Sequence, residues 1–267
     1  MEMTEILPGI YAVGTALWIS KKKILIFGDV HMGYEEALSD RGYLIPRVQF
    51  KESLWVLNEL FKTVKPSIII INGDLKHEFG HISDQEWMDT SKFINILSEH
   101  CKKIILVKGN HDTILGPIAK KKNLELVPFY SLKIGTMEKK IEGKENHLKK
   151  FAKALTHKKS IRTICIFHGD KIIRDKAALE TDLLIIGHDH PAVVLNEGPK
   201  SEKYKCFLLG KWKKQSLIAM PSFLPTIEGT NVKQEELLSP YLKQDLDKFD
   251  AFIVGDKVYK FGKIKYI

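Results

Sequence analysis

The chain has 267 residues, of which 44% are hydrophobic and 28% are charged. This composition is typical of a globular protein with a substantial core, and it excludes a disordered or fibrous chain. Lysine and arginine outnumber aspartate and glutamate by 42 to 33, so the formal net charge is +9 and favours association with an anionic partner.

Three features of the sequence predict a soluble, cytoplasmic protein. No apolar run approaches the roughly 20 residues of a membrane span, so no membrane partner is expected. The N-terminal residues, 1–5, are acidic and lack the pattern of a signal peptide. The three cysteines, Cys101, Cys165 and Cys206, have no metal-type spacing and indicate buried thiols in a reducing compartment.

Apolar patterning predicts alternating strands and helices in the first half of the chain. A loosely alternating strand is expected at 10–19, and a buried strand follows at 24–27. Apolar side chains at helical spacing predict a helix over 48–61, which ends before Pro66 because proline cannot continue a helix. Four consecutive isoleucines predict a strand at 68–71 that is buried on both faces.

The same patterning continues to the end of the chain. Asp84 is interpreted as the N-cap of a helix that runs to His100. Further elements are expected as strands at 104–107, 124–134, 163–167, 183–186, 217–220 and 252–254, with a short helix at 172–180 and loop or short helix over 221–248. We see no internal repeat and no long linker, so one domain over residues 1–267 is predicted.

Five of the predicted strands end in Asp, Asn or His, and at four of these ends a glycine directly precedes that residue. Ligands in open α/β sheets bind outside the carboxyl ends of the strands, so we expect these side chains to lie together. One such motif is weak evidence for a site, but five in series are hard to explain as structure alone. The side chains are Asp29, His31, Asp74, Asn110, His111, His168, His188 and His190.

These residue types predict a metal centre. Carboxylate, carboxamide and imidazole groups suit Mn²⁺, Fe²⁺ or Zn²⁺, and the lack of a thiolate disfavours a structural zinc site. Seven ligands, all of these side chains except His111, are too many for one ion, whereas two ions about 3.5–4 Å apart that share a carboxylate would use them all. Such a pair clamps phosphoryl oxygens and activates water, which predicts hydrolysis of a phosphate ester.

The motifs also resemble those of a known family, the calcineurin-like metallophosphoesterases. They are Asp29-x-His31, Gly73-Asp74, Gly109-Asn110-His111-Asp112, His168 and Gly187-His188-x-His190. The resemblance implies an α/β (α+β) chain with a four-layer fold, in which two mixed β-sheets form a sandwich flanked by helices. It also implies two divalent ions, with Mn²⁺ preferred over Fe²⁺ or Zn²⁺.

The family pattern implies a role for each site residue. One ion would be held by Asp29, His31, Asp74 and His190, and the other by Asp74, Asn110, His168 and His188. Asp74 would bridge them. His111 corresponds to the histidine that protonates the leaving oxygen, which suits an imidazole because it titrates near working pH. His77 stands where an aspartate would orient that acid. Asp112 and Asp189 are interpreted as partners of imidazole N–H groups, although Asp112 could equally cap the next helix.

Finer features of the motifs point toward nucleases. The run Gly73-Asp74-Leu75-Lys76-His77 lacks the phosphate-binding arginine of protein phosphatases and is similar to that of SbcD-type DNA repair nucleases. The run 187–191, and Met220-Pro221-Ser222-Phe223 followed by Gly229, resemble archaeal SbcD-related phosphoesterases and the ligase-associated DNA damage response endonuclease PdeM. The chain ends too early for the capping domain of full-size repair nucleases. The resemblance implies a DNA or RNA nuclease, with nucleic acid as its partner.

A basic insertion is predicted around 136–162. Residues 139–162 hold nine lysines or arginines against two glutamates. Two interpretations remain open, a solvated loop or a surface that contacts a phosphate backbone. Only Phe151 is aromatic there, so we do not expect the insertion to stack on bases.

Two alternatives to a nuclease also remain open. The first is a phosphodiesterase or phosphatase for small or cyclic nucleotides, and the second is an inactive scaffold of the same fold. The scaffold is disfavoured because every ligand position is intact. The sequence indicates neither a protein partner nor an oligomeric state.

Overall fold

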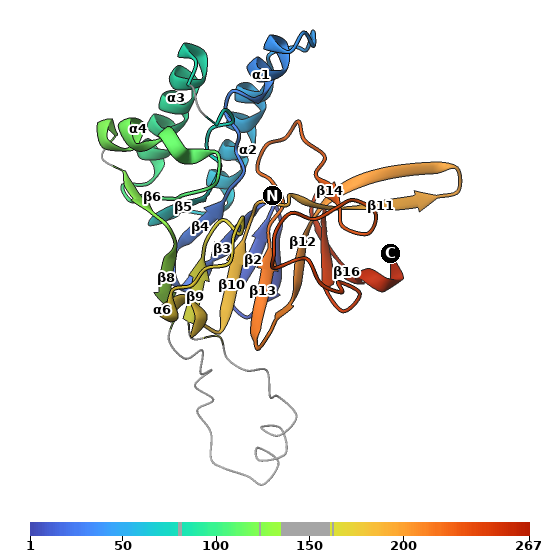
Figure 1. The fold of residues 1–267 in the computed structure, drawn as a ribbon. Coiled ribbons are helices and arrows are strands. Elements are labelled where there is room, and N and C mark those ends of the chain that lie inside the picture. The colour runs from blue at the N-terminus through green and yellow to red at the C-terminus, as the bar shows by residue number, and fades with distance from the viewer. Residues whose placement is uncertain (80–81, 123, 135–160, 162) are drawn as a thin grey trace.

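The computed structural model describes residues 1–79, 82–122, 124–134, 161 and 163–267. Within them the chain forms two mixed β-sheets flanked by helices, as predicted (Figure 1). The basic insertion predicted around 136–162 lies outside the described residues, apart from Ile161. The expectation of a single domain over 1–267 stays a prediction.

The first sheet begins antiparallel and becomes parallel. Its seven described strands, in spatial order, are β1 (Met3–Leu7), β2 (Ile10–Val13), β3 (Ala16–Ile19), β4 (Ile24–Phe27), β5 (Ile68–Asn72), β6 (Ile104–Val107) and β7 (Glu125–Val127). Neighbours from β4 to β7 run parallel. The single strand predicted at 10–19 is wrong, because Gly14, with φ of 53°, turns the chain between β2 and β3.

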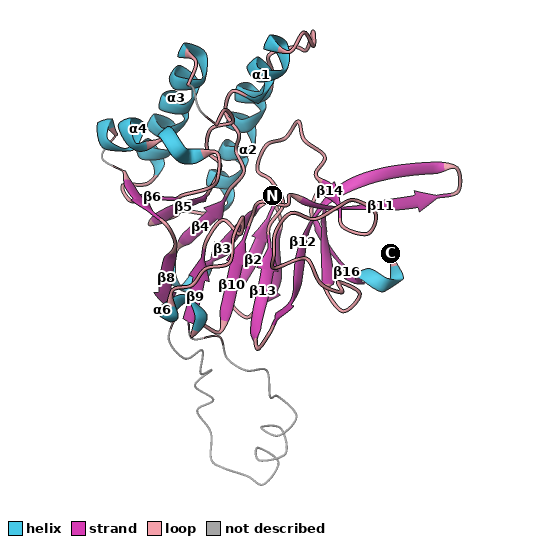
Figure 2. Ribbon diagram, in the orientation of Figure 1, coloured by secondary structure: helices cyan, strands magenta, loops and turns pink. Residues whose placement is uncertain are grey.

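Helices cover one face of this sheet, as Figure 2 shows in cyan. They are α2 (Gln49–Thr63), α3 (Asp84–His100) and α4 (Gly116–Lys121), whose side chains pack on β4 and β5. Helix α1 (Tyr34–Asp40) precedes α2 and lies farther from the sheet. Side chains of the parallel strands alternate, so Leu25 and Ile69 pack under the helices while Ile24 and Ile70 face the second sheet. This double burial explains the isoleucine run of β5.

The second sheet contains the remaining described strands. They are β8 (Tyr130–Lys133), β9 (Thr163–Ile166), β10 (Leu183–Ile186), β11 (Pro191–Glu197), β12 (Lys200–Trp212), β13 (Gln215–Ala219), β14 (Thr230–Asn231), β15 (Asp250–Val254) and β16 (Val258–Lys263). The spatial order is β14-β11-β12-β13-β10-β9-β8, and β15 joins β12 to β16. Strands β9, β10 and β13 run parallel.

Several predicted boundaries differ from the structure. The strand predicted at 124–134 divides at Pro128 into β7 and β8, which belong to different sheets. The helix predicted at 172–180 is only α6 (Lys176–Leu179). Ser83, not Asp84, is the N-cap of α3, because its hydroxyl accepts a hydrogen bond from the Glu86 amide at 3.0 Å.

The smaller elements complete the described chain. Short 3-10 helices lie at η1 (Ser20–Lys22), η2 (Asp112–Ile114) and η3 (Ile264–Tyr266). All three cysteines are buried and free, as expected. Among the helices of the described residues, none has the length and apolarity needed to cross a membrane.

The core between the sheets predicts a contrast between two leucines. Leu217 of β13 is 0% exposed, whereas Leu44 is 103% exposed. Leu217→Ala should lower the free energy of unfolding by about 2–5 kcal/mol, because it removes buried methyl groups and leaves a cavity. Leu44→Ala should change it by less than about 0.5 kcal/mol in the same urea titration. Equal effects of the two substitutions would contradict the packing described above.

Candidate metal centre

Five strand ends from the two sheets meet at one edge of the sandwich. The loops carry Asp29 and His31 after β4, Asp74 after β5, Asn110 and His111 after β6, His168 after β9, and His188 and His190 after β10. Every ligand predicted from the sequence therefore lies at this edge. The first three loops come from the first sheet and the last two from the second.

Backbone hydrogen bonds join these loops to one another. The amide of Asp29 donates to the carbonyl of Gly73 at 3.0 Å, and the amide of His31 donates to the carbonyl of Asp74 at 2.9 Å. In the second sheet, the Gly187 amide donates to the His168 carbonyl at 2.8 Å. These loops thus hold each other in place.

The backbone is strained at the predicted ligands. In the described part of the chain, seven non-glycine residues have positive φ, and five of them are Asp29 (55°), His31 (47°), Asp74 (49°), His188 (74°) and His190 (47°). Each such residue costs on the order of 1 kcal/mol, and this strain clusters at functional sites. The loop-to-loop hydrogen bonds maintain the strained conformations.

One cluster of donor atoms forms around His190. Its Nε2 lies 3.3 Å from Asp29 Oδ1 and 3.3 Å from His31 Nε2. His31 Nε2 lies 3.9 Å from Asp74 Oδ2. These four side chains are the set that the family pattern implies for one ion.

A second cluster forms around His168. Its Nε2 lies 2.9 Å from Asn110 Oδ1, 3.1 Å from His188 Nδ1 and 3.2 Å from Asp74 Oδ2. The other ring nitrogen of His168, Nδ1, donates to the carbonyl of Asn72 at 3.2 Å. This hydrogen bond leaves Nε2 free to act as a ligand. These four side chains are the set implied for the other ion.

The two clusters fit divalent ions. Donor atoms about 2.1 Å from one ion lie about 3–3.5 Å from each other, close to the spacings found here. Asp29 and Asp74 are 0% and 2% exposed. Their ion-pair partners among the described residues are imidazoles, and Lys205 also interacts electrostatically with Asp29. Two buried carboxylates side by side require positive charge, which a pair of ions would supply.

The electrostatics of the site agree with this requirement. Burial alone would raise the pKa of the Asp74 carboxyl, but His168 outweighs burial and lowers that pKa well below its usual range. Burial, together with His190, lowers the pKa of His31 to about 3, so this imidazole is neutral and able to bind metal. Burial would lower the pKa of His168, but Asp74 and Asp29 raise it to about 10. His168 thus carries the proton that a divalent ion would replace.

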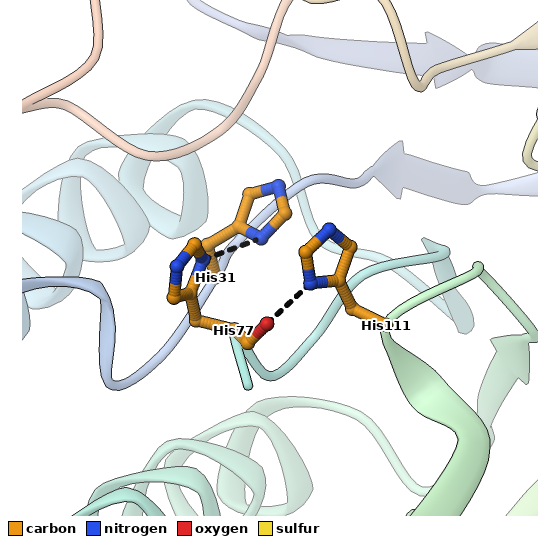
Figure 3. Close-up of side chains that lie close together, drawn as sticks. All are labelled: His31, His77 and His111. Carbon is orange, nitrogen blue, oxygen red and sulfur yellow. Dashed lines mark hydrogen bonds between the residues drawn. The ribbon is translucent and has the colours of Figure 1, made fainter. Parts of the chain in front are cut away.

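His77 and His111 lie beside the first cluster (Figure 3). His111 Nδ1 donates to the backbone carbonyl of His77, and His111 Nε2 lies 3.8 Å from Asp74 Oδ2. The Nδ1 atom of His77 lies 3.4 Å from His31 Nδ1, and the His77 ring stacks on that of His111 with 5.4 Å between the ring centroids. The structure therefore places both the backbone carbonyl and the ring of His77 against the predicted acid.

Asp112 and Asp189 differ from their interpretation as imidazole partners. The carboxylate of Asp112 accepts backbone N–H groups from Asp74 at 2.8 Å, Leu75 at 3.0 Å and Gly109 at 2.9 Å. Asp189 accepts the amides of residues 238 and 239, at 2.7 and 2.9 Å. Both carboxylates fix loops, because a carboxylate accepts several backbone donors at once.

Gln49 is a supporting residue that the sequence analysis missed. Its side-chain amide donates to the carbonyls of Val30 and His31, at 3.1 and 2.7 Å, and so holds the first ligand loop. Gln49 is the first residue of α2 and is only 4% exposed. The sequence carried no signal for this role, since a glutamine at the start of a helix is ordinarily solvated.

A glycine beside Asp74 supports a prediction. A Cβ added at Gly109 would lie 2.1 Å from Asp74 Oδ1, whereas one at Gly116 would meet nothing within 4 Å. Neither glycine has a positive φ, so only the available space differs. Gly109→Ala should lower the free energy of unfolding by about 1–3 kcal/mol, because the carboxylate must shift. Gly116→Ala is the matched control in urea unfolding, and equal stability of the two variants would contradict the crowding.

Comparison with a solved structure supports the fold. The chain is similar to the crystal structure of Pseudomonas putida nuclease MPE, with a TM-score of 0.61 at 15% identity over 97% of this chain and 99% of that chain. Wild-type Vps29 complexed with Zn²⁺, from Entamoeba histolytica, gives a TM-score of 0.35 at 17% identity over 87% of this chain and 86% of that chain. A search of curated proteins finds no match.

The family is shown by a direct match. A model of the calcineurin-like phosphoesterases matches residues 22–192, which is more than half of the chain and spans all the predicted ligands. Members of this family hydrolyse phosphate esters with divalent metal ions. The chain belongs to the calcineurin-like phosphoesterase family.

Proposed function

We propose that this protein is a metal-dependent phosphodiesterase that cleaves nucleic acid at a two-ion centre. The observation that carries the proposal is the position of one atom, Asp74 Oδ2. It lies 3.2 Å from His168 Nε2 in one donor cluster and 3.9 Å from His31 Nε2 in the other. A carboxylate shared in this way is what a two-ion phosphoesterase requires.

Nucleic acid is the substrate that the remaining observations favour. The run from Gly73 to His77 resembles SbcD-type nucleases, and the later motifs resemble PdeM and the archaeal SbcD-related phosphoesterases. The net charge of +9 favours a polyanion. The similar fold from Pseudomonas putida is named a nuclease. These points support a nuclease over the small-nucleotide enzyme that the sequence left open.

The proposed ligand sets follow the two clusters. Asp29, His31 and His190 would hold one ion, Asn110, His168 and His188 the other, and Asp74 would contact both. We propose Mn²⁺ as the metal, because hard oxygen and imidazole donors without thiolate suit it, with Fe²⁺ or Zn²⁺ as alternatives. Bound ions supply Lewis acidity for the phosphoryl oxygens and lower the pKa of water.

His111 is proposed as the acid for the leaving oxygen. Its Nδ1–H is held by the backbone carbonyl of His77, so its Nε2 faces Asp74 and the site. The ring of Phe79 covers the imidazole, with 3.7 Å between the ring centroids. A proton on Nε2 passes to the leaving oxygen as the ester bond breaks, while the His77 carbonyl keeps the ring oriented.

His77 is proposed as a positioning residue. Its backbone orients His111, and its ring meets His31 Nδ1 at 3.4 Å. A hydrogen bond between those two Nδ1 atoms leaves His31 Nε2 directed at the cluster. The Glu86 carboxylate fixes His77 in turn, because it accepts the His77 amide at 2.7 Å.

The proposal is tested by the substrates that the Mn²⁺-loaded protein cleaves. It should cleave single- or double-stranded DNA, or RNA, and Asp74→Asn should abolish this activity. Efficient turnover of 2′,3′-cyclic nucleotides without nucleic-acid cleavage would establish the small-nucleotide alternative instead. If the metal-loaded wild type has neither activity, the protein is an inactive scaffold.

The role of His111 predicts a dependence on the leaving group. His111→Ala should lower kcat by roughly 10²–10⁴-fold for an alkyl phosphodiester, the range for a missing general acid. The loss should be much smaller for a p-nitrophenyl ester, because p-nitrophenolate needs little protonation to leave. His100→Ala is the matched control, since His100 stacks on Phe61 outside the site. Equal losses for both esters would show that His111 does not donate the proton.

A further inference from the structure

A cleft of about 780 Å³ opens beside the second donor cluster. Asn110 and His168 line it, so it begins at the proposed metal centre. It lies beyond the carboxyl ends of β6 and β9, where the two sheets meet. Its volume falls within the roughly 300–1,000 Å³ of ordinary ligand sites.

The walls of this cleft are apolar and partly exposed. Phe129 is half-buried, and Ile172 is 50% exposed. Phe167 contributes a side chain that is only 3% exposed. The backbone of Ile173 is fixed, because its amide donates to the hydroxyl of buried Tyr241 at 2.8 Å. An exposed aromatic and aliphatic wall of this kind suits the flat face of a nucleobase.

Basic side chains surround the apolar wall. Lys108, Lys171 and Arg174 line the cleft and are exposed, against one carboxylate, Asp170, which lies 3.7 Å from Lys171. Exposed cations at the edge of a cleft attract phosphate groups without reading sequence.

A second pocket has the reverse charge. It has a volume of about 300 Å³, lies beside α1, and is lined by the carboxylates of Glu36, Asp40, Glu78 and Glu86, with Arg41 as its one basic lining residue. A negatively charged strand would be repelled by that surface and attracted to the cleft. This difference in charge favours a position of the negatively charged substrate in the cleft and not in the pocket beside α1.

We propose that this cleft binds the nucleoside next to the scissile phosphodiester. The base packs against Phe129 and Ile172, and the adjoining phosphates lie near Lys108 and Arg174. This assignment rests on the proposed function and names its substrate as a nucleotide with an unpaired base, from a single strand or a strand end. The free nucleotide shares this chemistry and is distinguished by the experiment.

The first test uses two substrates with the same leaving group. Thymidine 5′-(p-nitrophenyl phosphate) carries a nucleoside, and methyl p-nitrophenyl phosphate does not. The Mn²⁺-loaded wild type should prefer the thymidine ester in kcat/KM. Phe129→Ala and Ile172→Ser should reduce that preference by between about 5-fold and 150-fold, the range for stacking one base. Ile172→Ser is the safer variant, because Phe129 packs partly on the core.

The control variant is Phe261→Ala. Phe261 is 51% exposed, lies on β16 and is not among the residues that line the cleft. It should leave the preference of the wild type unchanged. A wild type that hydrolyses both esters equally well, or cleft variants that match Phe261→Ala, would overturn the assignment while leaving the proposed phosphodiesterase activity intact.

The second test measures binding alone. A fluorescent tetrathymidylate with phosphorothioate linkages resists cleavage, and its affinity for the Mn²⁺-loaded protein should fall in both cleft variants. Arg174→Gln should make the slope of log affinity against log salt shallower by about 0.7. Variant-sensitive binding without any ester hydrolysis would support the cleft and contradict the proposed function. If the cleft variants lose the preference for the thymidine ester but bind the oligonucleotide as tightly as the wild type does, the cleft binds free nucleotides instead.

Discussion

The placement of the Asp74 carboxylate is the constraint on which the rest of the site depends. Its Oδ1 accepts the backbone amide of His111 at 2.9 Å, so its Oδ2 is directed at the imidazoles of both clusters. The Asp112 carboxylate accepts the backbone amide of Asp74 at 2.8 Å. Gly109 leaves room for the Asp74 carboxylate because it has no Cβ. A buried carboxylate in this position is unfavourable without nearby positive charge. The arrangement therefore fits a site for cations.

The architecture explains why two sheets are needed. Parallel strands deliver their carboxyl ends to one edge. The first sheet supplies the carboxylates, His31 and Asn110, and the second supplies His168, His188 and His190. Direct contacts such as the Asp29 carboxylate with the His188 amide, at 3.2 Å, join the two sheets at the site. The proposed cleft lies at the same junction, so substrate binding and catalysis share one rigid frame.

The sequence predicted the fold class and the buried strands after which the candidate site residues lie. Buried strands such as β4 and β5 are short apolar runs that end in a ligand, so both the element and the site residue are visible in the pattern. The β11–β12 hairpin was missed because its strands carry mostly polar, exposed side chains. Residues 124–134 are divided between two sheets by tertiary packing, and no pattern in the local sequence indicates this division. Gln49, and the backbone role of His77, were equally invisible, because both depend on which loops meet in space.

The number of ions bound per chain tests the account most directly. Calorimetric titration of the metal-free wild type with Mn²⁺ should show two ions per chain, and elemental analysis of the loaded protein should give the same number. Asp74→Ala should lose most of both, since each cluster loses the carboxylate that the two clusters share. Asn110→Ala should retain the ion of the Asp29, His31 and His190 cluster while the other is weakened. A wild type that binds one ion, or none, would contradict the two-ion centre.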